Sequence, residues 1–158
     1  MANNTKSFTT VKKNIALTIS IVDGLSVEGL RIQGQQSLQN GYNNLVMISS
    51  DSEIPDKDML ASIFLPASLL KTNSMNNESA LKRRISAFLY DNSRLFQNNA
   101  SSSSNNQLDS KILSASIKGM TISNLSPDQE MRSSFYPLNT SLSGNASCVY
   151  WNLTKTGK

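Results

Sequence analysis

Short segments with apolar residues at every second position recur along the chain. The clearest lies at residues 14–22, where isoleucine and leucine alternate with mostly small or polar residues. A repeat of two is the period at which the side chains of a β-strand return to the same face. Further strands are expected at residues 27–33, 44–49, 61–65, 83–90, 111–118 and 148–151, with residues 120–123 continuing in register after Gly119. Short strands, polar turns and no long helical pattern predict an all-β fold, an antiparallel β-sandwich.

The segments between these strands are polar. Pro66 stands where proline is favoured at the start of a helix, so one short helical turn is expected over residues 66–70. Residues 1–13 are expected to be a flexible lead-in. Residues 97–108 contain a run of Asn and Ser and are expected to be a mobile polar loop. Because strand patterning resumes on both sides of that loop, residues 1–158 are expected to form a single domain.

Composition agrees with one domain that is not embedded in a membrane. The 158 residues are about one domain's worth of chain, with 38% hydrophobic and 16% charged residues. Neutral polar residues fill the difference, with 36 Ser plus Thr and 18 Asn. No apolar run approaches the roughly 20 residues of a membrane span. Polar residues also interrupt the apolar core that a secretory signal needs. The sequence therefore predicts neither a transmembrane segment nor a signal peptide in this chain.

Residues suited to chemistry are scarce. There is one cysteine and no histidine, so a disulfide-dense scaffold, a zinc finger and imidazole-based catalysis within the chain are excluded. The carboxylates are dispersed, and Asp56 and Asp58 flank Lys57 in a loop without converging on a metal. We therefore expect no catalytic residue, no metal ligand, no cofactor and no enzymatic activity.

The positive charge of the chain does not indicate a nucleic-acid partner. The formal net charge is +4 and the pI is 9.3. The only tight basic cluster is Lys82-Arg83-Arg84, which leads into the alternating residues Ile85, Ala87 and Leu89. This pattern is typical of the solvated start of a strand, whereas phosphate binding normally needs a stripe of basic clusters. We expect no nucleic-acid binding.

The sequence contains seven Asn-x-Ser/Thr acceptor motifs for N-glycosylation. They begin at Asn3, Asn77, Asn99, Asn124, Asn139, Asn145 and Asn152. Chance alone gives about four in a chain with this content of Asn, Ser and Thr, so a chain that is simply rich in these residues explains the count about equally well. Pro127 directly follows the motif at Asn124 and makes it the weakest candidate. Use of these motifs would place the chain outside the cell.

Five segments, taken in order, carry more specific motifs. They are Ala61-Ser-Ile-Phe-Leu-Pro-Ala-Ser-Leu-Leu70, Arg84-Ile-Ser-Ala-Phe-Leu-Tyr-Asp-Asn-Ser-Arg-Leu-Phe96, Asp109-Ser-Lys-Ile-Leu-Ser-Ala-Ser-Ile-Lys-Gly119, Ile122-Ser-Asn-Leu-Ser126 and Cys148-Val-Tyr-Trp-Asn152. Together they resemble the autoproteolysis-inducing (GAIN) domain of adhesion G-protein-coupled receptors, specifically its C-terminal β-sandwich subdomain. Residues 14–50 resemble the preceding strands of that family less distinctively. By this resemblance, residues 148–158 are the start of the family's proteolysis-site (GPS) motif.

The resemblance implies an extracellular juxtamembrane module of a receptor, on the outer side of the plasma membrane. Its role would be to hold a tethered-agonist strand whose release activates the attached seven-transmembrane domain. The implied partners are that domain and an extracellular ligand or matrix protein. Cys148 would form a disulfide with a cysteine that this chain does not contain, and Trp151 would pack in the core of the GPS motif.

The sequence departs from the family at its C-terminal end. Cleaving members continue through a second tryptophan and further cysteines to a terminal His-Leu-Ser/Thr, whose histidine would activate the hydroxyl nucleophile. Here Asn152-Leu153-Thr154 offers an asparagine, which is no proton acceptor at neutral pH. We interpret Asn152 as a glycan acceptor or a turn residue. The chain is expected to stop inside the GPS motif, to leave the sandwich incomplete at its C-terminal edge and not to cleave itself.

A second interpretation needs no continuation of the chain. The same pattern fits a stand-alone secreted β-sandwich that serves in adhesion or ligand binding. In that case Cys148 would be a free thiol or would pair between molecules.

Overall fold

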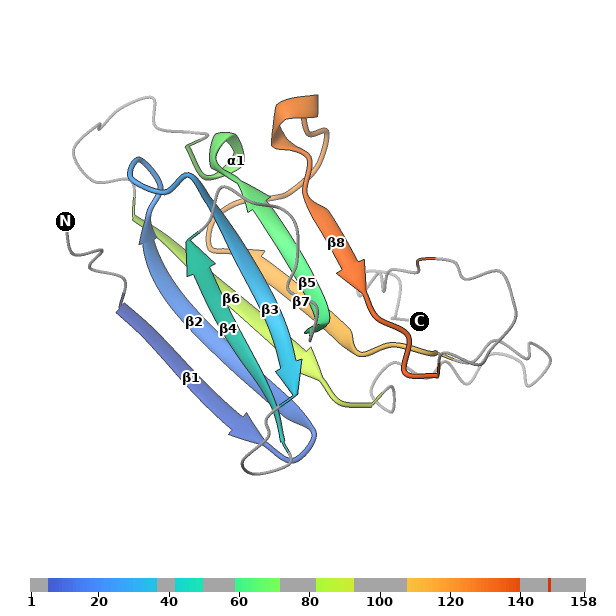
Figure 1. Cartoon of the computed structure of the whole chain (residues 1–158). Helices are drawn as coiled ribbons and strands as arrows, with labels where there is room; N and C mark the ends of the chain where they lie inside the picture. The colour runs from blue at the N-terminus through green and yellow to red at the C-terminus, as the bar shows by residue number, and fades with distance from the viewer. Residues whose placement is uncertain are drawn as a thin grey trace, which may run out of the picture.

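The computed structural model describes residues 6–36, 42–49, 59–71, 82–92, 108–139 and 148. Within these residues the chain forms two four-stranded sheets. Sheet A has the order β1 (Lys6–Lys12), β2 (Ile15–Asp23), β6 (Lys82–Tyr90) and β7 (Ile112–Ile117). Sheet B has the order β4 (Asn43–Ser49), β3 (Gly29–Gln36), β5 (Met59–Pro66) and β8 (Arg132–Phe135). All neighbouring strands are antiparallel, and the two sheets stack face to face (Figure 1). The predicted antiparallel β-sandwich is confirmed.

The core lies between the sheets and draws on both. In sheet A, Ile85, Ala87 and Leu89 of β6 are buried on one face, as their alternation predicts. In sheet B, β3 contributes Ile32, which is fully buried. Gly34 of β3 lies opposite Leu89, and a Cβ atom at Gly34 would be 2.8 Å from Leu89 Cδ1. The absence of a side chain at Gly34 therefore lets the two sheets approach closely at this point.

The orientation of β2 is the opposite of what hydrophobicity alone suggests. Its inward face consists of small and polar residues together with one valine: Ala16, Thr18, Ser20 and Val22, all buried. Its aliphatic row faces outward and is half-buried or exposed: Ile15, Leu17, Ile19 and Ile21. Thr18 is accommodated inside because its Oγ1 hydrogen-bonds Thr9 Oγ1 at 2.8 Å and donates to Phe8 O at 3.3 Å. A buried hydroxyl that is hydrogen-bonded avoids most of its desolvation penalty.

Two short helical segments close one end of the sandwich. They are α1 (Ala67–Lys71) and the 3-10 turn η2 (Pro127–Gln129). Leu69 and Leu70 anchor α1 in the core, and Ser68 Oγ donates to Asp128 O of η2. Arg83 Nε donates to Leu70 O at 3.2 Å, so this member of the basic cluster ties β6 to α1. The expected helical turn is present, although Pro66 ends β5 and the helix begins one residue later.

The described structure differs from the predicted elements in three places. Residues 6–12 were expected to be part of a flexible lead-in but form β1. Their hydrophobic alternation is weak, and pairing with β2 orders them. Strand β8 was not predicted, and it pairs with β5 over only four residues. Residues 120–123 were expected to extend a strand but follow the turn at Gly119 without strand pairing. The loop at 97–108 and the strand at 148–151 lie outside the described residues, except for Leu108 and Cys148.

The outward face of sheet B carries polar side chains that are shielded from solvent. On the two central strands, Arg31 and Gln33 of β3 and Ser62 of β5 are 6%, 0% and 3% exposed. Arg31 Nη1 donates to Gln33 Oε1 at 3.3 Å, which satisfies part of their polar character without solvent. Because both faces of β3 and β5 are shielded, these strands form the most protected part of the described fold.

Candidate functional site

The end of the sandwich opposite α1 and η2 contains a set of polar residues that joins strands from both sheets. Asp91 follows β6, Lys111 precedes β7 and Asn43 begins β4. Asn14 lies in the turn between β1 and β2. We call Asn14, Asn43, Asp91 and Lys111 the Asp91 cluster. These residues come together because antiparallel pairing brings the end of β6, the start of β7 and the β1–β2 turn to the same end of sheet A.

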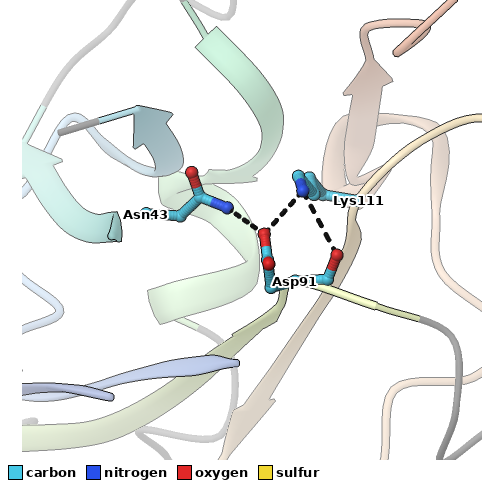
Figure 2. Close-up of polar contacts among 3 residues, drawn as sticks. All are labelled: Asn43, Asp91 and Lys111. Atoms are coloured by element: carbon cyan, nitrogen blue, oxygen red, sulfur yellow. Dashed lines mark hydrogen bonds and ion pairs between the residues drawn. The ribbon is translucent and has the colours of Figure 1, made fainter. Parts of the chain in front are cut away.

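Asp91 is the centre of this cluster (Figure 2). Lys111 Nζ lies 2.5 Å from Asp91 Oδ1 and 3.2 Å from Asp91 O. Asn43 Nδ2 donates to the same Oδ1 atom from sheet B. The Asp91 N–H donates to Asn14 O at 3.0 Å. One aspartate thereby connects the β1–β2 turn, the end of β6, the start of β7 and the first residue of β4.

The ion pair in the cluster is partly shielded from solvent. The Lys111 side chain is 15% exposed and that of Asp91 is 36% exposed. A charge pair that also makes hydrogen bonds to main-chain and amide groups is stronger than an isolated surface pair, which contributes roughly 0–1 kcal/mol. The Asp91 cluster therefore stabilises the alignment of the two sheets at this end.

A second contact at the same end leads toward the C-terminal part of the chain. Leu138 N–H donates to Asp109 O at 2.8 Å, and Asn139 N–H donates to Asp109 Oδ1 at 3.0 Å. Just before them, Tyr136 N–H donates to Leu60 O at 3.1 Å and extends the pairing of β8 with β5. The segment that leaves β8 in sheet B is thus fixed to the residues that precede β7 in sheet A.

This arrangement holds chain segments in place. Asp91 is engaged by Lys111 and Asn43, and no nucleophile paired with a base is present among these residues. Within the described ranges, no group of three or more His, Cys, Asp or Glu side chains could hold a metal ion. A cavity of about 70 Å³ lies between the sheets beside Ser20 and Met47. This volume is far below the roughly 300–1,000 Å³ of ligand pockets.

The structure places three of the sequence-predicted site residues. Cys148 is exposed. Asn139 is exposed just beyond β8, with its main-chain N–H held by Asp109. Asn124 is exposed in a turn with φ of +50°, a left-handed conformation that asparagine tolerates better than most residues. The other predicted site residues lie outside the described residues: Asn3, Asn77, Asn99, Asn145, Trp151 and Asn152. The three that are described do not come together in one site.

Sequence reasoning missed the Asp91 cluster. It placed Asp91 directly after the expected strand at 83–90 and Lys111 at the start of the expected strand at 111–118, and it assigned neither residue a partner. The available signal was the position of charged residues directly at strand ends, where side chains from neighbouring strands meet. This signal does not say which charged residues contact each other, because the sequence does not reveal which strands are neighbours.

Among the described residues, no helix has the length and apolar character that crossing a membrane requires.

The fold and the site define a class: a two-sheet antiparallel sandwich whose polar residues fix strand ends to each other. The family model named GPS, GAIN subdomain B, matches residues 24–158. The chain therefore belongs to the GAIN subdomain B family, the subdomain that the sequence resemblance predicted. No curated protein matches the sequence.

A solved structure has the same fold. The full extracellular region of zebrafish Gpr126/Adgrg6 superposes with a TM-score of 0.73 at 22% sequence identity. The match covers 95% of this chain and 19% of that chain. The structural match therefore also includes part of the chain before residue 24, where the family model does not reach. The chain spans about a fifth of the length of that extracellular region.

Proposed function

We propose that this chain is the juxtamembrane module of an adhesion G-protein-coupled receptor and holds a tethered-agonist strand for the receptor's own seven-transmembrane domain. The observation that carries the proposal is the attachment at Asp109. Its main-chain and side-chain oxygens accept hydrogen bonds from Leu138 and Asn139, where the chain passes from β8 toward the segment that resembles the GPS motif. Membership of the GAIN subdomain B family supports the same role.

In this proposal the Asp91 cluster and Asp109 act together as a frame. The cluster aligns β4, β6 and β7, and Asp109 holds the segment after β8 against that aligned end. Weakening the frame would lower the free energy needed to release the strand that follows. A ligand or matrix protein that pulls on the extracellular region would act on the same equilibrium.

The test uses the full-length parent receptor on cells. Asp109→Ala and Lys111→Gln are expected to raise basal G-protein signalling by about fivefold at most, since one hydrogen bond contributes about 1 kcal/mol. Lys118→Gln is the matched control, because Lys118 is exposed beyond the other end of β7. Surface staining must show equal receptor levels. Unchanged or lower basal signalling in both variants at equal surface level would contradict the proposed function.

The location and the modifications follow from the same proposal. We infer that the chain lies on the extracellular side of the plasma membrane, that Asn139 carries a glycan and that the exposed Cys148 pairs with a cysteine outside this sequence. We also infer that the chain has no self-cleavage activity, because it contains no histidine to activate a hydroxyl nucleophile. Non-reducing and reducing electrophoresis of the surface-expressed receptor, with a Cys148→Ser variant as control, tests the disulfide.

A further inference from the structure

Strand β1 forms one edge of sheet A, and β7 forms the other edge among the described strands. Among the described strands, β1 pairs only with β2, and Lys6 to Thr9 are exposed. Phe8 is 61% exposed, the largest exposure among the large hydrophobic residues of the described chain. A strand edge presents unpaired N–H and C=O groups and so accepts a further strand.

The side chains at this edge have a definite order. In the register with β2, Lys6 pairs with Ile21 and Phe8 with Ile19, and Lys12 pairs with Ile15. Side chains of directly paired residues share a face, so Lys6, Phe8 and Lys12 lie on the outward face beside the aliphatic row of β2. Phe8 extends that row to the edge, and a lysine stands at each end of the strand.

The charges at this edge are available to a partner. Among the described residues, neither Lys6 nor Lys12 takes part in an ion pair. The same lysines disfavour a second copy of this chain. Antiparallel pairing of two β1 strands centred on Thr9 places Lys6 opposite Lys12 of the other copy at both ends, and like charges directly opposite are destabilising.

We propose that the β1 edge binds an extended acidic segment of a partner protein by strand addition. Main-chain hydrogen bonds to β1 would give the affinity, and side chains on the outward face would give the specificity. In the antiparallel orientation used throughout this fold, acidic residues at the first and seventh positions face Lys12 and Lys6. An apolar residue at the fifth position faces Phe8. The recognised pattern is thus acidic, any, polar, any, apolar, any, acidic.

The probe is the capped heptapeptide Glu-Thr-Thr-Thr-Val-Thr-Glu, added to the isotopically labelled full chain and followed by amide chemical shifts. The expected result is a saturable shift centred on Lys6–Lys12 and slower hydrogen exchange of amides in that strand. The peptide in which lysine replaces both glutamates should bind about tenfold more weakly, and so should the peptide in which serine replaces valine.

Exchanging the charges gives a second, independent readout. The K6E/K12E variant should prefer the lysine-flanked peptide over the glutamate-flanked peptide, reversing the order. The K82E/K118E variant is the matched control, because it changes the net charge equally at two exposed lysines away from β1 and should keep the original order. This experiment needs no receptor, so its outcome is separate from that of the proposed function.

Three results would overturn the proposal. Equal binding of the glutamate-flanked and lysine-flanked peptides would remove the charge recognition. Shifts centred on any other element would remove β1 as the site. Concentration-dependent dimerisation in sedimentation experiments, with slow exchange of the β1 amides in the absence of peptide, would show that a second copy of the chain occupies this edge.

Discussion

A Cβ atom on Gly34 of β3 would lie 2.8 Å from Cδ1 of Leu89 in β6. Real Cβ atoms essentially never approach another heavy atom so closely, so either the leucine or the strand must shift to admit a side chain. Leu89 is 1% exposed and sits within the core cluster. The contact therefore fixes the spacing of the two sheets at this point.

Gly34→Ala should lower the free energy of unfolding by about 1–3 kcal/mol, the usual range for overpacking a core. Leu89→Ala alone should cost about 2–5 kcal/mol through the cavity it creates. The double variant should be less destabilised than the sum, because the space left by the leucine receives the new methyl group. Urea unfolding of the four proteins measures this coupling, and strictly additive effects would contradict the close contact.

Thr18→Val should destabilise the chain by about 0.5–1.5 kcal/mol. The substitution keeps the shape but removes the hydroxyl that bonds Thr9 Oγ1 and Phe8 O from a position that is 2% exposed. Thr10→Val is the matched control, since Thr10 pairs with Leu17 on the outward face and should be nearly neutral. Thermal unfolding followed by circular dichroism distinguishes the two, and an equal effect of both variants would show that the inward hydroxyl has no special role.

Lys111→Gln should lower stability by about 1 kcal/mol, because it removes the ion pair with Asp91 while keeping a polar side chain. The dependence of this stability loss on salt concentration tests whether it arises from the charge of Lys111. Since screening weakens the native ion pair, the difference between the variant and the unaltered chain should shrink between low salt and 1 M salt. Lys118→Gln, at an exposed position, should show little difference under either condition. A salt-independent loss at Lys111 would indicate packing of the lysine stem instead of charge.

Asn139 should carry a glycan in secreted chain expressed by cells with the N-glycosylation pathway, whereas Asn124 should not. Both are exposed, but Pro127 directly follows the motif at Asn124 and begins η2. Mass spectrometry of peptides after enzymatic deglycosylation reports each site, because a released glycan leaves aspartate in place of asparagine. Asn139→Gln should remove one glycan mass, and Asn124→Gln should leave the total unchanged. Occupancy of Asn124 would refute this assignment.

The purified, unmodified chain should keep its full mass of 17.3 kDa during incubation at neutral pH. Self-cleavage through an acyl shift needs a base to activate the hydroxyl, and the chain contains no histidine. Intact-mass measurement over several days checks this outcome. A fragment that appears at a rate independent of chain concentration and of protease inhibitors would overturn it.

The strands with strong patterns were predictable from the sequence, and the β-sandwich followed from them. The segment at 83–90 coincides almost fully with β6, because its aliphatic residues alternate and bury one face. Among the described strands, the two that the sequence did not indicate are β1 and β8, which lie at sheet edges. Edge strands bury less, so their sequences carry less of the hydrophobic alternation on which prediction depends.

Two further features could not be predicted: which face of β2 is buried, and which residues contact Asp91. Both depend on how the strands are arranged in space. An alternating strand has two faces, and the more apolar face of β2 was the natural candidate for the core. In the structure the buried face of β2 is instead the one with Ala16, Thr18 and Ser20. The contacts of Asp91 with Asn43 and Lys111 span 48 and 20 positions in the chain. Such distant contacts depend on strand order, which a single sequence does not specify.

The attachment of residues 138 and 139 to Asp109 determines how tension would pass through the molecule. A pull on the chain beyond residue 139 meets β8, which is held to β5 over four paired residues. The same pull also reaches β7 in the other sheet through Asp109. The bonds to Asp109 lie nearer to the pulled end than β8 does, so they would have to break before β8 peels from β5. In such a pull, the attachment to sheet A would protect the short edge strand of sheet B.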